Sequence, residues 1–146
     1  SFDVYWCQDA LLFSTERSTA MAEAGRVVKP GGTIAITDLT VVGEPEGETA
    51  DLLAEISKPG FWSIEGYVAA LDEAGFDLIA AEDWSRHVLP SFQRIRDDMV
   101  IKKDQLVAIA GLAEVEDSIE RYNHWCDAAA TGYLGWAAVT GRKRET

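Results

Sequence analysis

The stretch Arg26-Val-Val-Lys-Pro-Gly-Gly-Thr-Ile-Ala-Ile-Thr-Asp38 decides the fold of this chain. Its first residues end a predicted helix, from about Glu16 to Val28, whose apolar positions recur at helical spacing. We interpret Lys29–Gly32 as a turn that stops this helix. Thr33–Thr37 is a predicted buried strand that ends at Asp38. A helix, a glycine-containing turn and an apolar strand in this order are typical of an α/β domain.

The segments on either side repeat this alternation of strand and helix. Phe2–Cys7 is rich in aromatic and β-branched residues and predicts a strand. A second helix is expected to begin at a Ser63 cap and to end before Gly75, followed by a strand over Phe76–Ala81. Such alternation predicts βαβ crossovers and a mainly parallel sheet with helices on both faces.

The rest of the chain is predicted to be helical up to a last strand. Pro90 to about Ala110 and Glu114 to about Ala130 have helical periodicity, and Tyr133–Val139 is the expected final strand. Val42–Thr49 is rich in Gly, Glu and Pro and predicts a loop. No second domain boundary is visible, so residues 1–146 are expected to belong to one domain.

Composition excludes several classes of function. The net charge of −12 argues against nucleic acid or an anionic membrane surface as a partner, because both are polyanions. No apolar run approaches the roughly 18 residues that span a bilayer. The cysteines, Cys7 and Cys126, form no CxxC pair, which favours free thiols in a reducing, cytoplasmic compartment.

The start of the sequence suggests that the chain is the C-terminal part of something longer. It begins at Ser1 rather than Met and enters a core-like strand at once. Half of a doubly wound sheet would also leave one edge strand unpaired. Both observations lead us to expect a missing N-terminal half.

Two acids mark the candidate binding site. Asp9 follows the first predicted strand and Asp38 follows the second, and ligands of open α/β sheets bind beyond the carboxyl ends of strands. Paired carboxylates there would suit a cationic or amine substrate. The alternative is structural: Asp9 caps the next helix and Asp38 makes a turn.

Other motifs point to no catalytic or metal-binding residue. Lys29–Gly32 follows a helix, whereas a phosphate-binding loop needs a strand before it. His124 and Cys126 match no zinc spacing, and Ser91 with His87 lacks a third partner for a triad.

The tryptophans allow two interpretations. An aromatic wall can hold a methylated ammonium by cation–π attraction. Plain core packing is the alternative, which we favour for at least three of the five: Trp6, Trp62, Trp84, Trp125 and Trp136.

The run Phe2-Asp-Val-Tyr-Trp-Cys-Gln-Asp-Ala-Leu-Leu12, with Arg26-Val-Val-Lys-Pro-Gly-Gly32 and Thr33-Ile-Ala-Ile-Thr-Asp38, resembles the second half of class I S-adenosylmethionine-dependent methyltransferases of the methyltransferase type 11 kind. The tail, from Asn123-His-Trp125 through Gly132-Tyr-Leu-Gly-Trp136 to Gly141-Arg-Lys143, is similar to the sarcosine/dimethylglycine N-methyltransferases of glycine betaine synthesis.

This resemblance implies the C-terminal half of a Rossmann-like sheet with an antiparallel last strand. Phe2–Cys7 would be the fourth strand of the family's seven and Thr33–Asp38 the fifth. The glycine-rich cofactor loop and the acid that holds the cofactor ribose would then lie upstream of Ser1. A chain without them is expected to be inactive alone.

The resemblance also implies roles for single residues. Cys7 and Gln8 would lie against the methionine end of S-adenosylmethionine, with Phe13 beside the cofactor where relatives commonly carry His. Asp9 would contact the acceptor amine and Asp38 would border the same pocket. An acceptor with a carboxylate would also need an arginine, and Arg86 and Arg94 are the candidates by their position near the pocket side.

The implied function is methyl transfer from S-adenosylmethionine to a small-molecule amine, with sarcosine or dimethylglycine as the leading acceptor. The alternatives are another small-molecule or lipid-headgroup acceptor, or a catalytically silent methyltransferase-like partner. The oligomeric state stays open.

Overall fold

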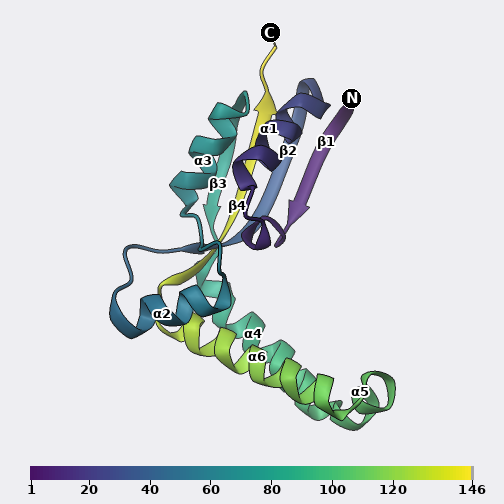
Figure 1. The fold of residues 1–146 in the computed structure, drawn as a ribbon. Helices are drawn as coiled ribbons and strands as arrows, with labels where there is room; N and C mark the ends of the chain where they lie inside the picture. Colours follow the sequence, from purple (N-terminus) through teal and green to yellow (C-terminus); the bar gives the residue numbers. More distant parts are fainter. Residues whose placement is uncertain (146) are drawn as a thin grey trace.

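The computed structural model describes residues 1–145 and contains one four-stranded sheet in the order β1-β2-β4-β3 (Figure 1). The strands are β1 (Phe2–Gln8), β2 (Val28–Val41), β3 (Phe76–Asp83) and β4 (Leu134–Lys143). β1 and β2 are parallel, and β4 is antiparallel to both β2 and β3. Three strands therefore share one direction and the last strand is reversed, which confirms the predicted sheet.

Helices α1 (Arg17–Val27) and α3 (Ile64–Glu73) pack on the same face of the sheet. Their side chains form one core with the inward residues of the strands: Leu11, Met21, Ala24, Val28, Ile34, Ile36, Tyr67, Ala70, Leu71, Phe76, Ala137 and Val139. The expectation of helices on both faces is wrong for these two. Both crossovers move across the sheet in the same direction, so connections of one hand put both helices on one side.

The opposite face of β1 is open within the described residues. Phe2, Val4 and Trp6 alternate along the strand, and their side chains are 61%, 57% and 71% exposed. Their outward position follows from the two-residue period of a strand, which directs Tyr5 and Cys7 to the helix-covered face.

A second group of helices lies beyond the carboxyl ends of the parallel strands (Figure 1). It comprises α2 (Gly47–Ile56), α4 (Val88–Ile101), α5 (Lys103–Ala110) and α6 (Leu112–Ala130). Helices α4 and α6 run side by side away from the sheet, with α5 at their far end. A second core joins this group to the strands: Leu12, Leu39, Leu53, Val88, Ala128 and Leu134.

The helical part differs from the prediction in two places. The expected loop over 42–49 gives way at Gly47 to α2, in which Leu53 is buried. The single helix expected over 90–110 is two helices, α4 and α5, which share Lys102 as their flanking residue. The spacing of apolar residues is similar on both sides of Lys102. It therefore does not reveal that the backbone leaves the helical conformation at this one residue.

Turn and cap residues account for most of the remaining boundaries. Ser63 caps α3 by accepting a hydrogen bond from the Gly66 amide at 3.2 Å, and Gly75 ends this helix with φ of 84°, both as predicted. Lys29–Gly32 is not a separate turn, because β2 already begins at Val28. An irregular pairing between Phe2 and Val4 absorbs the left-handed Gly31, with φ of 73°.

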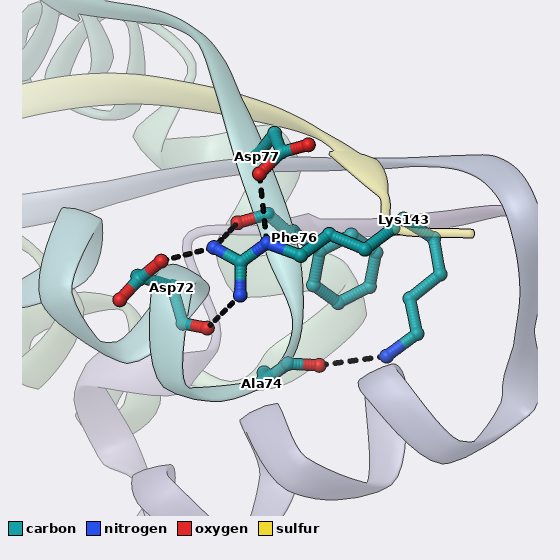
Figure 2. Close-up of polar contacts among 6 residues, drawn as sticks. Asp72, Ala74, Phe76, Asp77 and Lys143 are labelled. Carbon is teal, nitrogen blue, oxygen red and sulfur yellow. Dashed lines mark hydrogen bonds and ion pairs between the residues drawn. The ribbon is translucent and has the colours of Figure 1, made fainter. Parts of the chain in front are cut away.

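Hydrogen bonds and ion pairs join the end of β4 to the turn between α3 and β3 (Figure 2). The Arg144 guanidinium contacts the Asp72 carboxylate and donates to Asp77 at 2.7 Å. Lys143 donates to the Ala74 carbonyl at 2.9 Å and lies over the Phe76 ring at 5.1 Å. These contacts hold the antiparallel last strand in register at its far end.

Candidate functional site

The candidate site lies where β1 and β2 end and β4 begins. Asp9 directly follows β1, and its amide donates to the Thr37 carbonyl at 2.7 Å. Its φ of 48° is the only positive value among the described non-glycine residues. Trp136 reaches the same place because it is paired with Leu39 across β2 and β4. The fold thus brings two residues 127 positions apart in sequence to one point.

Asp9 is held there by a specific hydrogen bond. The Trp136 indole Nε1 donates to Asp9 Oδ1 at 2.8 Å. Burial raises the pKa of the Asp9 carboxyl above its usual range, and the bond from Trp136 opposes that rise.

A cavity of about 380 Å³ opens beside Asp9. Its walls come from β2, β4, α4, α6 and the short 3-10 helix Leu11–Phe13. The lining residues are Asp9, Leu12, Phe13, Leu39, Val88, Ser91, Phe92, Ile95, Arg121, Tyr122, Trp125 and Trp136. Nine of these twelve are apolar or aromatic, so the cavity is mainly apolar. Its one carboxylate, that of Asp9, lies where the cavity meets the sheet, which we call its sheet end.

A second cavity of about 310 Å³ adjoins the first and shares Phe13, Arg121 and Trp125 with it. The remaining lining comes from α2 and α6: Leu52, Glu55, Ile56 and His124. The two cavities therefore lie next to each other across these shared side chains, and the second one borders α2, the helix that the sequence did not predict.

Asp38 occupies a different environment from Asp9. It is 1% exposed, accepts a hydrogen bond from the Tyr67 hydroxyl at 2.6 Å, and accepts another from the Leu39 amide at 3.1 Å. Burial raises the pKa of Asp38 to about 6, although both hydrogen bonds oppose the rise. Asp38 lies close enough to Asp9 for the charge of Asp9 to raise this pKa further, but it is not in the cavity lining.

The structural alternative for these acids does not match their contacts. The residue before α1 is Glu16, and no side chain caps that helix. The short 3-10 helix Leu11–Phe13 likewise has no side-chain cap. Asp9 binds Trp136 and Asp38 binds Tyr67, so each carboxylate has a tertiary partner instead.

The expected cofactor-side residues lie around the end of β1. Cys7 is half-buried on the helix-covered face, and burial raises the pKa of its thiol. Gln8 is exposed at the end of the strand. Phe13 is 63% exposed and lines both cavities. The three residues surround Asp9 in sequence but do not form one continuous wall.

The arginine that lines the cavities is Arg121, whereas Arg86 was the expected partner for an acceptor carboxylate. Arg86 is exposed, donates to His87 Nε2 at 3.0 Å and lies outside both cavity linings. Arg121 lines both cavities, and its guanidinium is paired with Asp117 at 2.5 Å. Position in sequence after a strand favoured Arg86, whereas the folding back of α6 brings Arg121 to the site.

Sequence reasoning missed most of the wall that α6 provides. Arg121, Tyr122 and Trp125 line the first cavity from this helix. Their spacing of one, three and four residues places them on one helix face, which is the signal that could have identified them.

The tryptophans divide between wall and packing roles. Trp125 and Trp136 line the first cavity. Trp62 packs on Tyr67 at 5.1 Å between ring centroids and Trp84 packs on Trp136 at 5.6 Å, while Trp6 is exposed.

Within residues 1–145, no group of three or more His, Cys, Asp or Glu side chains could hold a metal ion. None of the helices in the same range is both long and apolar enough to cross a membrane. Cys7 and Cys126 are free.

Comparison with known proteins identifies relatives of this arrangement. The family described as "Methyltransferase domain" matches residues 1–36. Sarcosine/dimethylglycine N-methyltransferase of Aphanothece halophytica is 28% identical over 98% of this chain and 52% of its own length. 27-O-demethylrifamycin SV methyltransferase of Amycolatopsis mediterranei is 30% identical over 98% of this chain and 53% of its own length. The chain thus spans about half the length of the curated relatives it matches.

Solved structures show the same fold. A putative sarcosine dimethylglycine methyltransferase from Galdieria sulphuraria superposes with a TM-score of 0.85 at 21% identity, over 100% of this chain and 54% of the other. Phosphoethanolamine N-methyltransferase 2 of Haemonchus contortus, in complex with phosphomonomethylethanolamine and S-adenosylhomocysteine, gives 0.86 at 16% identity, over 99% and 34%. Residues 1–36 thus match the methyltransferase domain family, and over its whole length the chain has the fold of these methyltransferase structures.

Proposed function

We propose that this chain forms the acceptor side of an enzyme that transfers a methyl group from S-adenosylmethionine to a small-molecule amine. Sarcosine and dimethylglycine are the first acceptors to consider, since relatives at 28% identity carry those names. The observation that carries the proposal is the Asp9 carboxylate, fixed by Trp136 at the sheet end of an aromatic-lined cavity.

We further propose that residues 1–146 are part of one methyltransferase domain, whose remaining part holds most of the cofactor. The unpaired edge of β1 and its exposed Phe2, Val4 and Trp6 support this division. The residues present at the end of β1 fit the cofactor's methionine end in chemistry: an exposed Gln8 amide and a half-buried Cys7. When bound, S-adenosylmethionine would supply a methyl group on a sulfonium.

The side chains of the cavity are suited to binding an amine and stabilising its charge. Attack by the nitrogen lone pair on that methyl carbon would form the N–C bond as the S–C bond breaks, with its electron pair going to sulfur and S-adenosylhomocysteine as the leaving group. The product nitrogen would then carry positive charge beside Asp9. The carboxylate stabilises this charge, and the faces of Trp125 and Trp136 add cation–π attraction of about 0.5–2 kcal/mol each. Any amine must be unprotonated to react. After the transfer a secondary amine loses a proton, whereas a tertiary amine loses none, so a tertiary acceptor needs no base at that stage.

A different acceptor is the second candidate. The apolar lining of the cavity favours a larger natural product, and one relative is named for 27-O-demethylrifamycin SV. Phosphoethanolamine N-methyltransferases also occur among the relatives, at 27% identity, which keeps a phosphorylated amine in the set to be tested.

Methyl transfer from labelled S-adenosylmethionine tests the proposal. The 146-residue chain and the complete product of the open reading frame that contains it are assayed in parallel with sarcosine, dimethylglycine, phosphoethanolamine and a phenol. We expect label on the nitrogen of an amine with the complete product and no turnover with the chain alone. Label on the phenol and on none of the amines would show that the proposed acceptor class is wrong.

The Asp9→Asn variant of the complete product tests the role of the carboxylate. It removes the charge and keeps an oxygen that can accept the Trp136 N–H. A charge-assisted hydrogen bond contributes about 1.5–3 kcal/mol, so we expect kcat/KM for the amine to fall about 10–100-fold. Arg86→Gln, outside both cavity linings, is the matched control. An equal fall in the two variants would contradict the role given to Asp9.

A further inference from the structure

The two cavities together are larger than a small carboxylated amine requires. They measure about 380 and 310 Å³ and share Phe13, Arg121 and Trp125. Sites of about 300–1,000 Å³ in proteins bury drug-sized ligands. Either cavity alone falls within that range, so dimethylglycine would fill only part of the space.

The walls offer few polar side chains to a small zwitterion. Beyond Asp9, the charged or hydroxyl-bearing side chains of the first cavity are Ser91, Arg121 and Tyr122. The guanidinium of Arg121 forms an exposed ion pair with Asp117 at 2.5 Å. The aromatic and aliphatic side chains, in contrast, gain only from an apolar ligand surface.

The polarity of the lining side chains changes from the first cavity to the second. The carboxylate of Asp9 lies at the sheet end, and apolar side chains follow through the first cavity. Beyond Phe13 and Trp125, the second cavity offers Leu52 and Ile56 of α2, with Glu55 and His124 at its polar margin. The lining thus matches a molecule with one cationic or hydrogen-bonding head and a long apolar body.

We propose that the acceptor is an amphiphilic amine, whose amino group binds at Asp9 and whose apolar body extends past Phe13 and Trp125 into the second cavity. This inference rests on the proposed methyl transfer to an amine and adds the chemical class of the rest of the acceptor. Phe13 and Trp125 separate the head from the distal part, since they line both cavities.

A chain-length series tests the inference on the 146-residue chain itself. N,N-dimethylbutylamine, N,N-dimethylhexylamine and N,N-dimethyldecylamine share their head group with dimethylglycine and replace its carboxylate with an alkyl tail. Binding is measured by calorimetry and by fluorescence of the cavity tryptophans, below concentrations at which light scattering detects micelles. Each buried methylene raises affinity by up to about four-fold, so we expect the decyl compound to bind at least about ten-fold more tightly than the butyl compound.

Matched variants distinguish the cavities from the rest of the surface. Ile95→Asp places a charge in the first cavity, whereas Ile101→Asp places it on the same helix at a side chain that is 79% exposed and outside both linings. We expect only the first to abolish the dependence on tail length. Leu52→Gln, in the second cavity, is expected to weaken binding of the decyl compound and to leave the butyl compound unchanged.

The possible failures are distinguishable. Affinity that is independent of tail length, or equal losses in Ile95→Asp and Ile101→Asp, would overturn the apolar-body inference and leave methyl transfer to amines standing. If Ile95→Asp fails to fold, Leu52→Gln carries the test, because equal binding losses for the butyl and decyl compounds in that variant would overturn the inference. Absence of methyl transfer to every amine in the labelled assay, with N,N-dimethyldecylamine included among the acceptors, would overturn the proposed function and, with it, the amine head group.

Discussion

Asp38 and Tyr67 form a buried pair behind the cavity rather than inside it. The Tyr67 hydroxyl lies 2.6 Å from Asp38 Oδ2, and both side chains are 1% exposed. Burial raises the pKa of Tyr67, so its hydroxyl stays protonated and donates. The pair joins α3 to β2 just below the strand end that carries the candidate site, which makes Asp38 a structural carboxylate with a large effect on stability.

The Asp38→Asn substitution should reveal this effect in the pH dependence of stability. Below pH 3.8 the carboxyl is neutral in both the folded and the unfolded chain. As the pH rises toward about 6, the unfolded chain ionises first, and the free energy of unfolding falls. At about 1.4 kcal/mol for each pH unit, the loss is limited to about 3 kcal/mol.

Urea denaturation at several pH values measures this loss. Between pH 4 and 6 the unsubstituted chain should lose stability, whereas Asp38→Asn should not lose this contribution. The variant should therefore become more stable relative to the unsubstituted chain up to about pH 6, with no further change above it. Asp51→Asn, at an exposed position of α2, controls for the loss of one negative charge. A flat difference for Asp38→Asn would show that Asp38 does not titrate in this range.

Tyr67→Phe should lower the free energy of unfolding by an amount that depends on pH, because it removes the hydrogen bond to Asp38. It leaves Asp38 with the Leu39 amide as its remaining hydrogen-bond donor in the contacts described. A hydrogen bond to a charged group contributes about 1.5–3 kcal/mol and a neutral one about 1 kcal/mol. Denaturation at pH 7 should therefore show a larger loss of stability than at pH 4. Equal losses at the two pH values would contradict a hydrogen bond to an ionised Asp38.

The position of a site residue was predictable where it directly follows a strand. Asp9 lies at the strand end that the sequence indicated, and it lines the cavity. Asp38 was expected to border the same pocket, and its carboxylate accepts a hydrogen bond from Tyr67, because Asp38 lies within β2 on the same face as Ile34 and Ile36. Arg121 could not be inferred, since its place depends on how α6 folds back against α4.

At the level of elements, local signals identified the strands and caps but not every helix. The cap at Ser63 and the left-handed Gly75 have chemical signatures within a few residues. Helix α2 has no comparable start signal, because its flanking residue Glu46 makes no side-chain cap. It is fixed instead by burial of Leu53 in the second core, a tertiary contact that sequence periodicity cannot show.

The packing of α1 on the α3–β3 turn predicts opposite effects for two glycines. A Cβ at Gly25 would lie 2.3 Å from the Ala74 carbonyl oxygen, whereas a Cβ at Gly66 would lie 3.5 Å from its nearest neighbour. Gly25→Ala should lower stability by about 1–3 kcal/mol through overpacking, in spite of the gain in helix propensity. Gly66→Ala, in α3, should be neutral or stabilising by up to about 1 kcal/mol. Thermal unfolding of both variants checks this, and a stabilised Gly25→Ala would show that the α1–α3 contact is looser than described.

The molecule as a whole carries a large excess of negative charge. The net charge is −12 over 146 residues, and its ion pairs lie mostly at exposed positions, where each contributes little. Unpaired carboxylates therefore repel one another more than the pairs attract. Self-repulsion of this kind destabilises a compact state and is screened by salt.

Stability should consequently rise with salt at neutral pH. Between about 0.01 and 1 M NaCl the screening length falls from about 30 to about 3 Å, so repulsion between exposed carboxylates is largely removed. We expect the Tm at pH 7 to increase over this range, and the increase to vanish or reverse near pH 4.4, the isoelectric point of the sequence. The double variant Glu44→Lys/Glu46→Lys, at exposed positions before α2, changes the net charge from −12 to −8 and should show a smaller increase. A Tm that falls with salt at pH 7 would mean that attractive pairs outweigh the excess charge, and the same fall in the double variant would confirm that conclusion.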